Sequence, residues 1–232
     1  MLQGGMDFNC GEIAHAQFFT PREKNMTQGV SRGAVAPEDA DRADLYDFIG
    51  ALLQAAPNSD LLRAVAAMEI EPALSSTDVG KALERVIGEA RKTDEATLKR
   101  AYHDLFIGIG RGELVPYGSY YLTGFLNEKP LADLRASMAQ LGIARNEGVC
   151  EPEDHIASLM QMMGGLIRGD LWHEGPLPLA AQQAFFSGHI GKWAPHFFKD
   201  LEAQTTSPFY AAAGGLGRVL MAVEADAFSM AA

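Results

Sequence analysis

The chain has 232 residues, of which 47% are hydrophobic and 21% are charged, a balance typical of soluble globular proteins. Thirty acidic residues against nineteen basic ones give a formal net charge of -11, which disfavours binding to nucleic acids and to anionic membrane surfaces. Cys10 and Cys150 form no CxxC pair, so neither a disulfide framework nor a thiolate zinc site is indicated. The N-terminus lacks the pattern of a secretory signal, and no run of about 18 apolar residues occurs, so we expect a cytoplasmic protein without membrane insertion.

The N-terminal residues 1–36 mix glycine, polar and isolated aromatic residues without sustained periodicity. We therefore expect a loosely ordered extension, within which Met26 is an alternative start, and a folded domain over residues 37–232. From Pro37 the apolar residues recur at helical spacing, and this first predicted helix ends before Pro57.

Three more helices are predicted before the first long loop. The second is capped by Asn58 and Ser59, and a third follows it. Thr93 is expected to cap the fourth helix, which runs to a stop at Gly110. The glycine-rich residues 110–118 then predict a surface connection.

The second half of the sequence again shows helical spacing. Helices are predicted behind Pro130 and Pro152, then over the aromatic-rich residues 185–201, and finally from Ser207. No strand pattern is evident, so the sequence predicts an all-α bundle of roughly nine to eleven helices. The segment 142–151 is the candidate hinge between two half-bundles.

The densest polar cluster precedes the helix whose apolar face starts at Ile156, and it consists of Glu151, Pro152, Glu153, Asp154 and His155. One interpretation is ordinary helix-start chemistry, with proline at the first position and acids in the first turn. The other is a binding site, because His155 falls at the edge of the apolar face, with Ser158 three residues further on. A metal site is a third interpretation, although no HExxH motif occurs.

A second unusual stretch contains three tyrosines in a loop that becomes a helix: Pro116, Tyr117, Gly118, Ser119, Tyr120, Tyr121 and Leu122. Tyrosine is a rigid, amphipathic contact residue, so the stretch suits peptide binding. The alternatives are that two of the tyrosines pack in the core and that Ser119 is only a helix cap.

A third stretch combines His189, Trp193, His196 and Phe197. Core aromatics and structural histidines are one interpretation, and a C-terminal aromatic wall of a binding groove is the other. No GxSxG nucleophile motif is present. Neither Gly188–Lys192 nor Gly214–Gly217 has the spacing and context of a nucleotide-binding loop.

These motifs, in this order, resemble those of the TorD/DmsD family of redox-enzyme maturation chaperones, with the NarJ group more distant. The run Glu151–His155 is similar to the family's E-P-x-D-H motif, and residues 116–122 are similar to its aromatic Gly-Ser loop. The segment His189–Leu201 resembles its H-x-x-x-W segment, and Ser207–Tyr210 resembles the entrance of its final helix. The resemblance covers about residues 40–225, leaving residues 1–36 without a counterpart.

The resemblance implies an all-helical, non-enzymatic chaperone. Because a helical bundle with a mid-chain hinge can exchange halves, both a monomer and a domain-swapped dimer remain open. Its expected partners are the immature body and the twin-arginine signal peptide of a molybdopterin-dependent oxidoreductase, and we assign no cofactor. The residues expected to bind the signal peptide are Glu151, Asp154, His155, Ser158, Pro116, Tyr117, Gly118, Ser119, Tyr120, Tyr121 and Leu122. A peptide groove needs both polar and aromatic walls, so the two motifs are expected to lie side by side.

Two other functions remain open. A small helical metalloenzyme would use Glu151, Asp154 and His155, or alternatively His189 and His196, as ligands. A subunit-assembly adaptor would bind the client without recognising a signal peptide.

Overall fold

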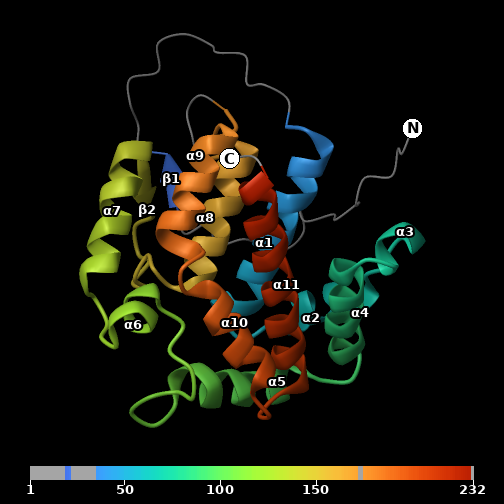
Figure 1. The fold of residues 1–232 in the computed structure, drawn as a ribbon. Coiled ribbons are helices and arrows are strands. Elements are labelled where there is room, and N and C mark those ends of the chain that lie inside the picture. The colour runs from blue at the N-terminus through green and yellow to red at the C-terminus, as the bar shows by residue number, and fades with distance from the viewer. Residues whose placement is uncertain (1–18, 22–34, 172–174, 231–232) are drawn as a thin grey trace. The chain divides into compact units, whose positions relative to one another are not determined.

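The structure is a computed structural model that describes residues 19–21, 35–171 and 175–230. Helices make up most of these residues (Figure 1), which confirms the predicted all-α class. The α-helices of the described chain are α1 (Pro37–Gln54), α2 (Ser59–Ala67), α3 (Pro72–Ser75), α4 (Asp78–Ala90), α5 (Glu95–Tyr102), α6 (Gly118–Thr123), α7 (Lys129–Leu141), α8 (Ile156–Arg168), α9 (Leu179–Phe185), α10 (Ala194–Ala203) and α11 (Pro208–Met230). Two π-helical turns, η2 (His103–Ile107) and η3 (Phe186–Ile190), extend α5 and α9.

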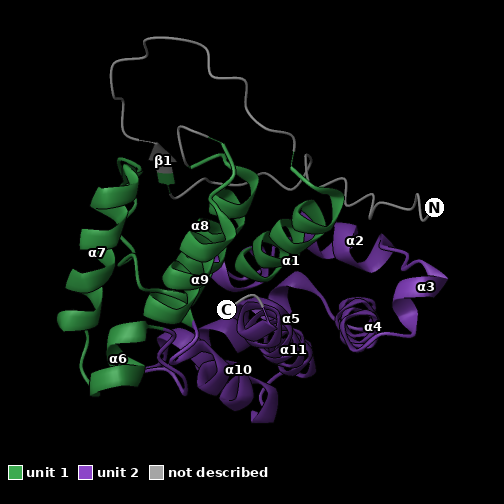
Figure 2. Cartoon of the chain, turned by 45° about the horizontal axis from the view of Figure 1, so that its top comes forward, with its two compact units in different colours: residues 1–50, 117–190 green, residues 51–116, 191–232 purple. Residues whose placement is uncertain are grey.

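The chain divides into two compact units (Figure 2). Unit 1 comprises residues 1–50 and 117–190, and unit 2 comprises residues 51–116 and 191–232, so that the last turn of α1 belongs to unit 2. The segment 142–151 lies inside unit 1, between α7 and α8. The predicted hinge is therefore not where the two units divide.

Helix α8 forms the centre of unit 1, since all of its residues from Ile156 to Ile167 are buried except Gln161. A helix that is apolar on all sides must be covered on all sides. At Gly164 a Cβ atom would lie 2.6 Å from Oδ1 of Asp47 and 3.0 Å from the Ala43 carbonyl oxygen, so α1 approaches α8 closely there. At the end of α8, Arg168 donates to Asp44 at 2.5 Å and also pairs with Asp47. Packing and charge together join α8 to α1.

A short strand pair departs from the purely helical prediction. Strand β1 (Phe19–Pro21) pairs antiparallel with β2 (Ile143–Arg145), both in unit 1. Each strand has three residues, too few to show the alternation that identifies a strand in a sequence. The Phe19 side chain is buried.

The helix boundaries also correct two predictions in unit 2. Asn58 caps α2 as expected, accepting from the Leu61 amide at 2.9 Å. The cap of α5 is Asp94, whose Oδ1 accepts from the Thr97 amide at 2.7 Å, so the Thr93 prediction is wrong by one residue. An aspartate is the stronger cap because its charge also interacts with the helix dipole. The helical segment ends at Gly108, which adopts φ 60°, and not at Gly110.

The glycine run of α11 has a packing role in unit 2. A Cβ atom on Gly217 would lie 2.2 Å from the Phe198 ring, and one on Gly214 would lie 2.4 Å from the Glu202 backbone nitrogen. Helix α11 therefore packs against α10 at a distance that only glycine permits.

Candidate functional site

The structure brings the two central motifs together within unit 1, as predicted. Tyr117 and His155 form an isolated antiparallel bridge, and the Gly118 amide donates to the Asp154 carbonyl oxygen at 2.9 Å. The Tyr117 and His155 rings meet edge to face with their centroids 5.1 Å apart. We call this contact between residues 117–119 and residues 151–155 the motif junction.

Asp154 holds the start of α6. Its side chain is buried, and Oδ2 accepts from the Ser119 amide at 2.7 Å. The first amides of a helix have no intrahelical partner, so this carboxylate caps α6 from a distant part of the sequence. The N-cap position itself is Tyr117, whose side chain makes no capping bond. The alternative that Ser119 is the cap is therefore wrong, because its amide is the capped group.

His155 is the N-cap of α8. Its Nδ1 accepts from the Ala157 amide at 3.2 Å, which requires a neutral ring with its proton on Nε2. Burial lowers the pKa of His155 to about 4, so the ring stays neutral at physiological pH. Only 4% of the residue is exposed, and it lies within the packed interior instead of lining an open groove.

The helix-start interpretation of the acidic run also needs correction. Helix α8 begins at Ile156, so Pro152 is not its first residue and the acids precede its first turn. Ser158 is buried within α8 at 1% exposure.

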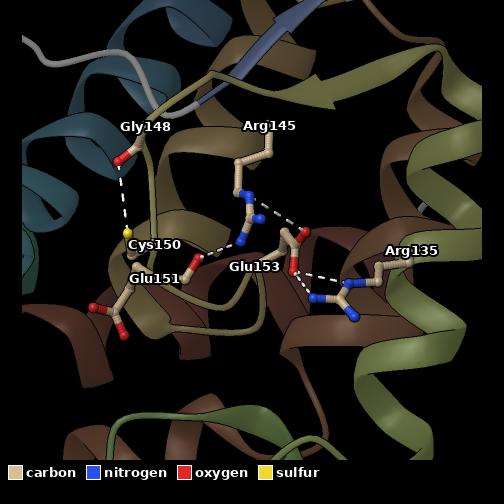
Figure 3. A network of polar contacts seen from close by, with 6 residues as sticks. All are labelled: Arg135, Arg145, Gly148, Cys150, Glu151 and Glu153. Carbon is tan, nitrogen blue, oxygen red and sulfur yellow. Dashed lines mark hydrogen bonds and ion pairs between the residues drawn. The ribbon is translucent and has the colours of Figure 1, made fainter.

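Glu153 is the centre of an ion cluster (Figure 3). Its buried carboxylate accepts from Arg135 of α7 at 2.8 and 3.0 Å and lies 3.9 Å from Nε of Arg145 on β2. Arg145 also donates to the Glu151 carbonyl oxygen at 3.3 Å. Two cations thus neutralise one buried carboxylate and attach the acidic run to α7 and β2. Neither arginine could be identified from the sequence, because neither belongs to a motif. Their only signal is that a buried acid requires a nearby cation.

Glu151 and Tyr117 are the accessible polar pair of the motif junction. Both are partly exposed, and the Tyr117 hydroxyl donates to Oε1 of Glu151. Figure 3 shows the Glu151 carboxylate pointing away from the Arg135–Glu153–Arg145 cluster. It is therefore not neutralised by those arginines.

Exposed apolar residues lie in the last turn of α6 and directly after it. Leu122 is 42% exposed, Phe125 69% and Leu126 48%, and the half-buried Tyr120 and Tyr121 precede them. We call Leu122, Phe125 and Leu126 the α6 patch. Grouped exposed apolar side chains mark interaction surfaces more often than isolated ones do. Leu122 belongs to the predicted site, whereas Phe125 and Leu126 were not predicted because they lie in a short turn without helical periodicity.

The residues of the third stretch fall in different units. His189 lies in unit 1, where its Nε2 is 2.8 Å from the Ser137 hydroxyl. Trp193 and Phe197 are buried in unit 2 with ring centroids 6.1 Å apart, and His196 is exposed there. The structure shows a packing role for the two aromatics, and the aromatic wall stays a prediction.

The metalloenzyme alternative receives no support from the ligand geometry. In the part of the chain that the structure describes, no group of three or more His, Cys, Asp or Glu side chains is arranged to hold a metal ion. Within the motif junction, Nδ1 of His155 and Oδ2 of Asp154 are both engaged in capping.

Among the described helices, none combines the length and apolarity needed to cross a bilayer.

Comparison with known proteins identifies the family. A family model described as nitrate reductase delta subunit matches residues 73–199, more than half of the chain. The chain belongs to the TorD family of redox-enzyme maturation chaperones. The chaperone protein TorD of Aliivibrio fischeri is 28% identical over 190 residues, which cover 75% of this chain and 88% of the relative. That of Photobacterium profundum is 32% identical over 144 residues, covering 59% and 67% respectively.

Among solved structures, a redox-enzyme maturation protein from Archaeoglobus fulgidus aligns with 86% of this chain and 99% of its own, at 21% identity and a TM-score of 0.49. Membership of the TorD family agrees with the order of the sequence motifs. The family model spans both halves of the motif junction, residues 117–119 and 151–155.

Proposed function

We propose that this TorD-family chain is a cytoplasmic chaperone that binds the twin-arginine signal peptide and the immature body of a molybdopterin-dependent oxidoreductase. The observation that carries the proposal is the motif junction, which holds a partly exposed carboxylate, Glu151, at the start of the helix that ends in the α6 patch. Membership of the TorD family supports a molybdoenzyme precursor as the kind of partner.

The two halves of this surface match the two halves of a twin-arginine signal peptide. The guanidinium groups of the peptide suit Glu151, and its apolar region suits the α6 patch. Helix α6 has six residues and so spans about 9 Å, which separates the charged and apolar contacts by a few residues of peptide.

The energies indicate which half dominates. A charge-assisted hydrogen bond contributes about 1.5–3 kcal/mol, whereas a micromolar complex needs about 8 kcal/mol. Most of the affinity must therefore come from apolar burial, at about 25 cal/mol per Å².

The predicted site residues consequently divide into two roles. Glu151, Tyr117 and Leu122 are accessible enough to contact a peptide. Asp154 and His155 are buried caps, so they position the surface without touching the peptide, and Ser119 and Ser158 are likewise buried.

The protein-side experiment is calorimetric titration of full-length variants with twin-arginine peptides from molybdoenzymes of the same genome. Phe125→Ser and Leu126→Ser should each weaken binding by about tenfold or more, the equivalent of one lost apolar contact. Leu179→Ser is the matched control, because Leu179 is 49% exposed in unit 1 but lies on α9. Glu151→Gln should weaken binding by about tenfold or less.

The peptide side gives an independent check. Replacing both arginines by lysine keeps the charge but loses bidentate geometry, so affinity should fall modestly. Polar substitutions in the apolar region should reduce it much more. If no such peptide binds below about 100 μM while the immature enzyme body does bind, the chain is an assembly adaptor and the signal-peptide proposal is wrong.

A further inference from the structure

The strand pair of unit 1 lies next to the proposed binding surface. The antiparallel register places Phe19 opposite Arg145 and Pro21 opposite Ile143. Arg145 in turn donates to the Glu151 carbonyl oxygen and contacts Glu153. Figure 3 shows the Arg145 side chain extending from β2 towards both groups. The Arg145 side chain thus connects β2 to the motif junction.

Strand β1 offers few backbone groups for pairing with β2. The strand has three residues, and Pro21 has no amide hydrogen to donate to the ladder. Its apolar anchor is Phe19, which is only 4% exposed although it precedes α1 by many residues. Strand pairing through the backbone depends little on sequence, so another extended segment with a large apolar side chain in the place of Phe19 fits the same edge.

The sequence around β1 has the chemistry that the proposed client peptide needs. Residues 18–24 read F-F-T-P-R-E-K, in which two phenylalanines are followed by an arginine and a lysine. An apolar anchor with nearby basic residues is also what the motif junction and the α6 patch would select in a partner.

We propose that β1 is an internal occupant of a strand-addition site on β2, and that an extended, apolar and basic segment of the client displaces it. The identity of the partner rests on the proposed function, whereas the site is defined by β2 and the buried Phe19. Because β1 is part of the same chain, its high effective concentration keeps the edge covered until a client arrives. Displacement of β1 replaces the strand that pairs with Arg145. Because the Arg145 side chain also contacts Glu151 and Glu153, peptide binding at β2 is linked to the motif junction.

The first experiment tests the strand-addition site without any client. A fluorescein-labelled peptide with the sequence of residues 15–24 is titrated, by fluorescence anisotropy, into the full-length wild type and into full-length Phe19→Ser. The variant loses the internal anchor, so the peptide should bind it at least about tenfold more tightly than the wild type. Phe8→Ser, which removes another aromatic from the N-terminal residues, should behave as the wild type. Equal affinity for wild type and Phe19→Ser overturns the proposal.

The second experiment tests the client and controls for folding. In a Cys10→Ser, Cys150→Ser background, Thr20→Cys and Ala144→Cys introduce cysteines at directly paired positions, where Cβ atoms about 4.5–5.5 Å apart allow a disulfide after a small adjustment. The oxidised protein, with β1 fixed in place, should bind a twin-arginine peptide at least about tenfold more weakly than the same protein after reduction.

The two experiments separate the proposals. Equal affinity in both redox states means that the client does not use the β2 edge, which overturns displacement and leaves the proposed function intact. If neither state binds any signal peptide, the proposed partner is wrong together with the proposed function. Binding of the residue 15–24 peptide to Phe19→Ser still decides whether the edge is a strand-addition site.

Discussion

Replacing Asp154 by alanine should destabilise unit 1, since it removes the cap of α6 from a buried position. The charge-assisted bond from the Ser119 amide to Oδ2 is 2.7 Å long, and bonds of this kind contribute about 1.5–3 kcal/mol. The variant also leaves the Ser119 amide buried without this acceptor, although relief of carboxylate desolvation offsets part of that cost. We expect a loss of about 2 kcal/mol in the free energy of unfolding, or a decrease in Tm of roughly 4–8 °C for a chain of this size.

The assay is urea denaturation followed by far-UV circular dichroism, with Asp133→Ala as the control. Asp133 is an exposed aspartate of α7, so its removal should change stability by no more than about 0.5 kcal/mol. Asp154→Asn keeps a side-chain oxygen that accepts from the Ser119 amide, and it should fall between the wild type and the alanine variant. If Asp154→Ala is as stable as Asp133→Ala, the carboxylate does not cap α6 and the positioning role assigned to it is wrong.

Three further predictions concern substitutions in unit 1. Burial lowers the pKa of His155 from 6.5 to about 4, so its contribution to stability is fully present above pH 6.5 and is lost as the pH falls towards 4. Denaturation at pH 7 and pH 4.5 should show a decrease about 2 kcal/mol larger in the wild type than in His155→Asn, which retains a capping side chain. Gly164→Ala should lower the free energy of unfolding by about 1–3 kcal/mol because its Cβ atom would meet α1. Its control, Gly88→Ala in α4, has open space around the Cβ position and should raise the free energy of unfolding by about 0.5–1 kcal/mol. Thermal unfolding measures both. Arg168→Met should cost about 1–2 kcal/mol in the same assay, since it removes the cation that pairs with Asp44, and the site's 25% exposure limits the effect.

The helices could be predicted from the sequence because their signals are local. Apolar residues at helical spacing identify α1, α4 and α8, and the cap Asn58 defines the start of α2 within one residue. Strand β1 could not be predicted, since a three-residue strand forms only where its partner β2, far away in the sequence, is already placed.

The candidate site was predicted in part for the same reason. The motifs at 117–119 and 151–155 are recognisable in the sequence. Their contact was predicted because a peptide groove needs both a polar and an aromatic wall. The burial of Asp154 and the pairing of Glu153 with Arg135 and Arg145 depend on tertiary packing, which no local pattern reports.

The arrangement changes how substitutions in the E-P-x-D-H run should be interpreted. Asp154 and His155 cap two different helices, and Glu153 attaches the run to α7 and β2, so three of its five residues hold structural elements together. A loss of client binding in an Asp154 or His155 variant is therefore compatible with a displaced α6 patch and is no evidence of direct contact. Glu151 is different, because it is partly exposed and its bond to Tyr117 joins two side chains at the surface of the junction. Glu151→Gln should consequently weaken peptide binding while the free energy of unfolding, measured by urea denaturation, stays within about 0.5 kcal/mol of the wild type. Loss of stability without loss of binding in that variant would place Glu151 with the structural residues of the run and leave the α6 patch as the sole contact surface of the proposal.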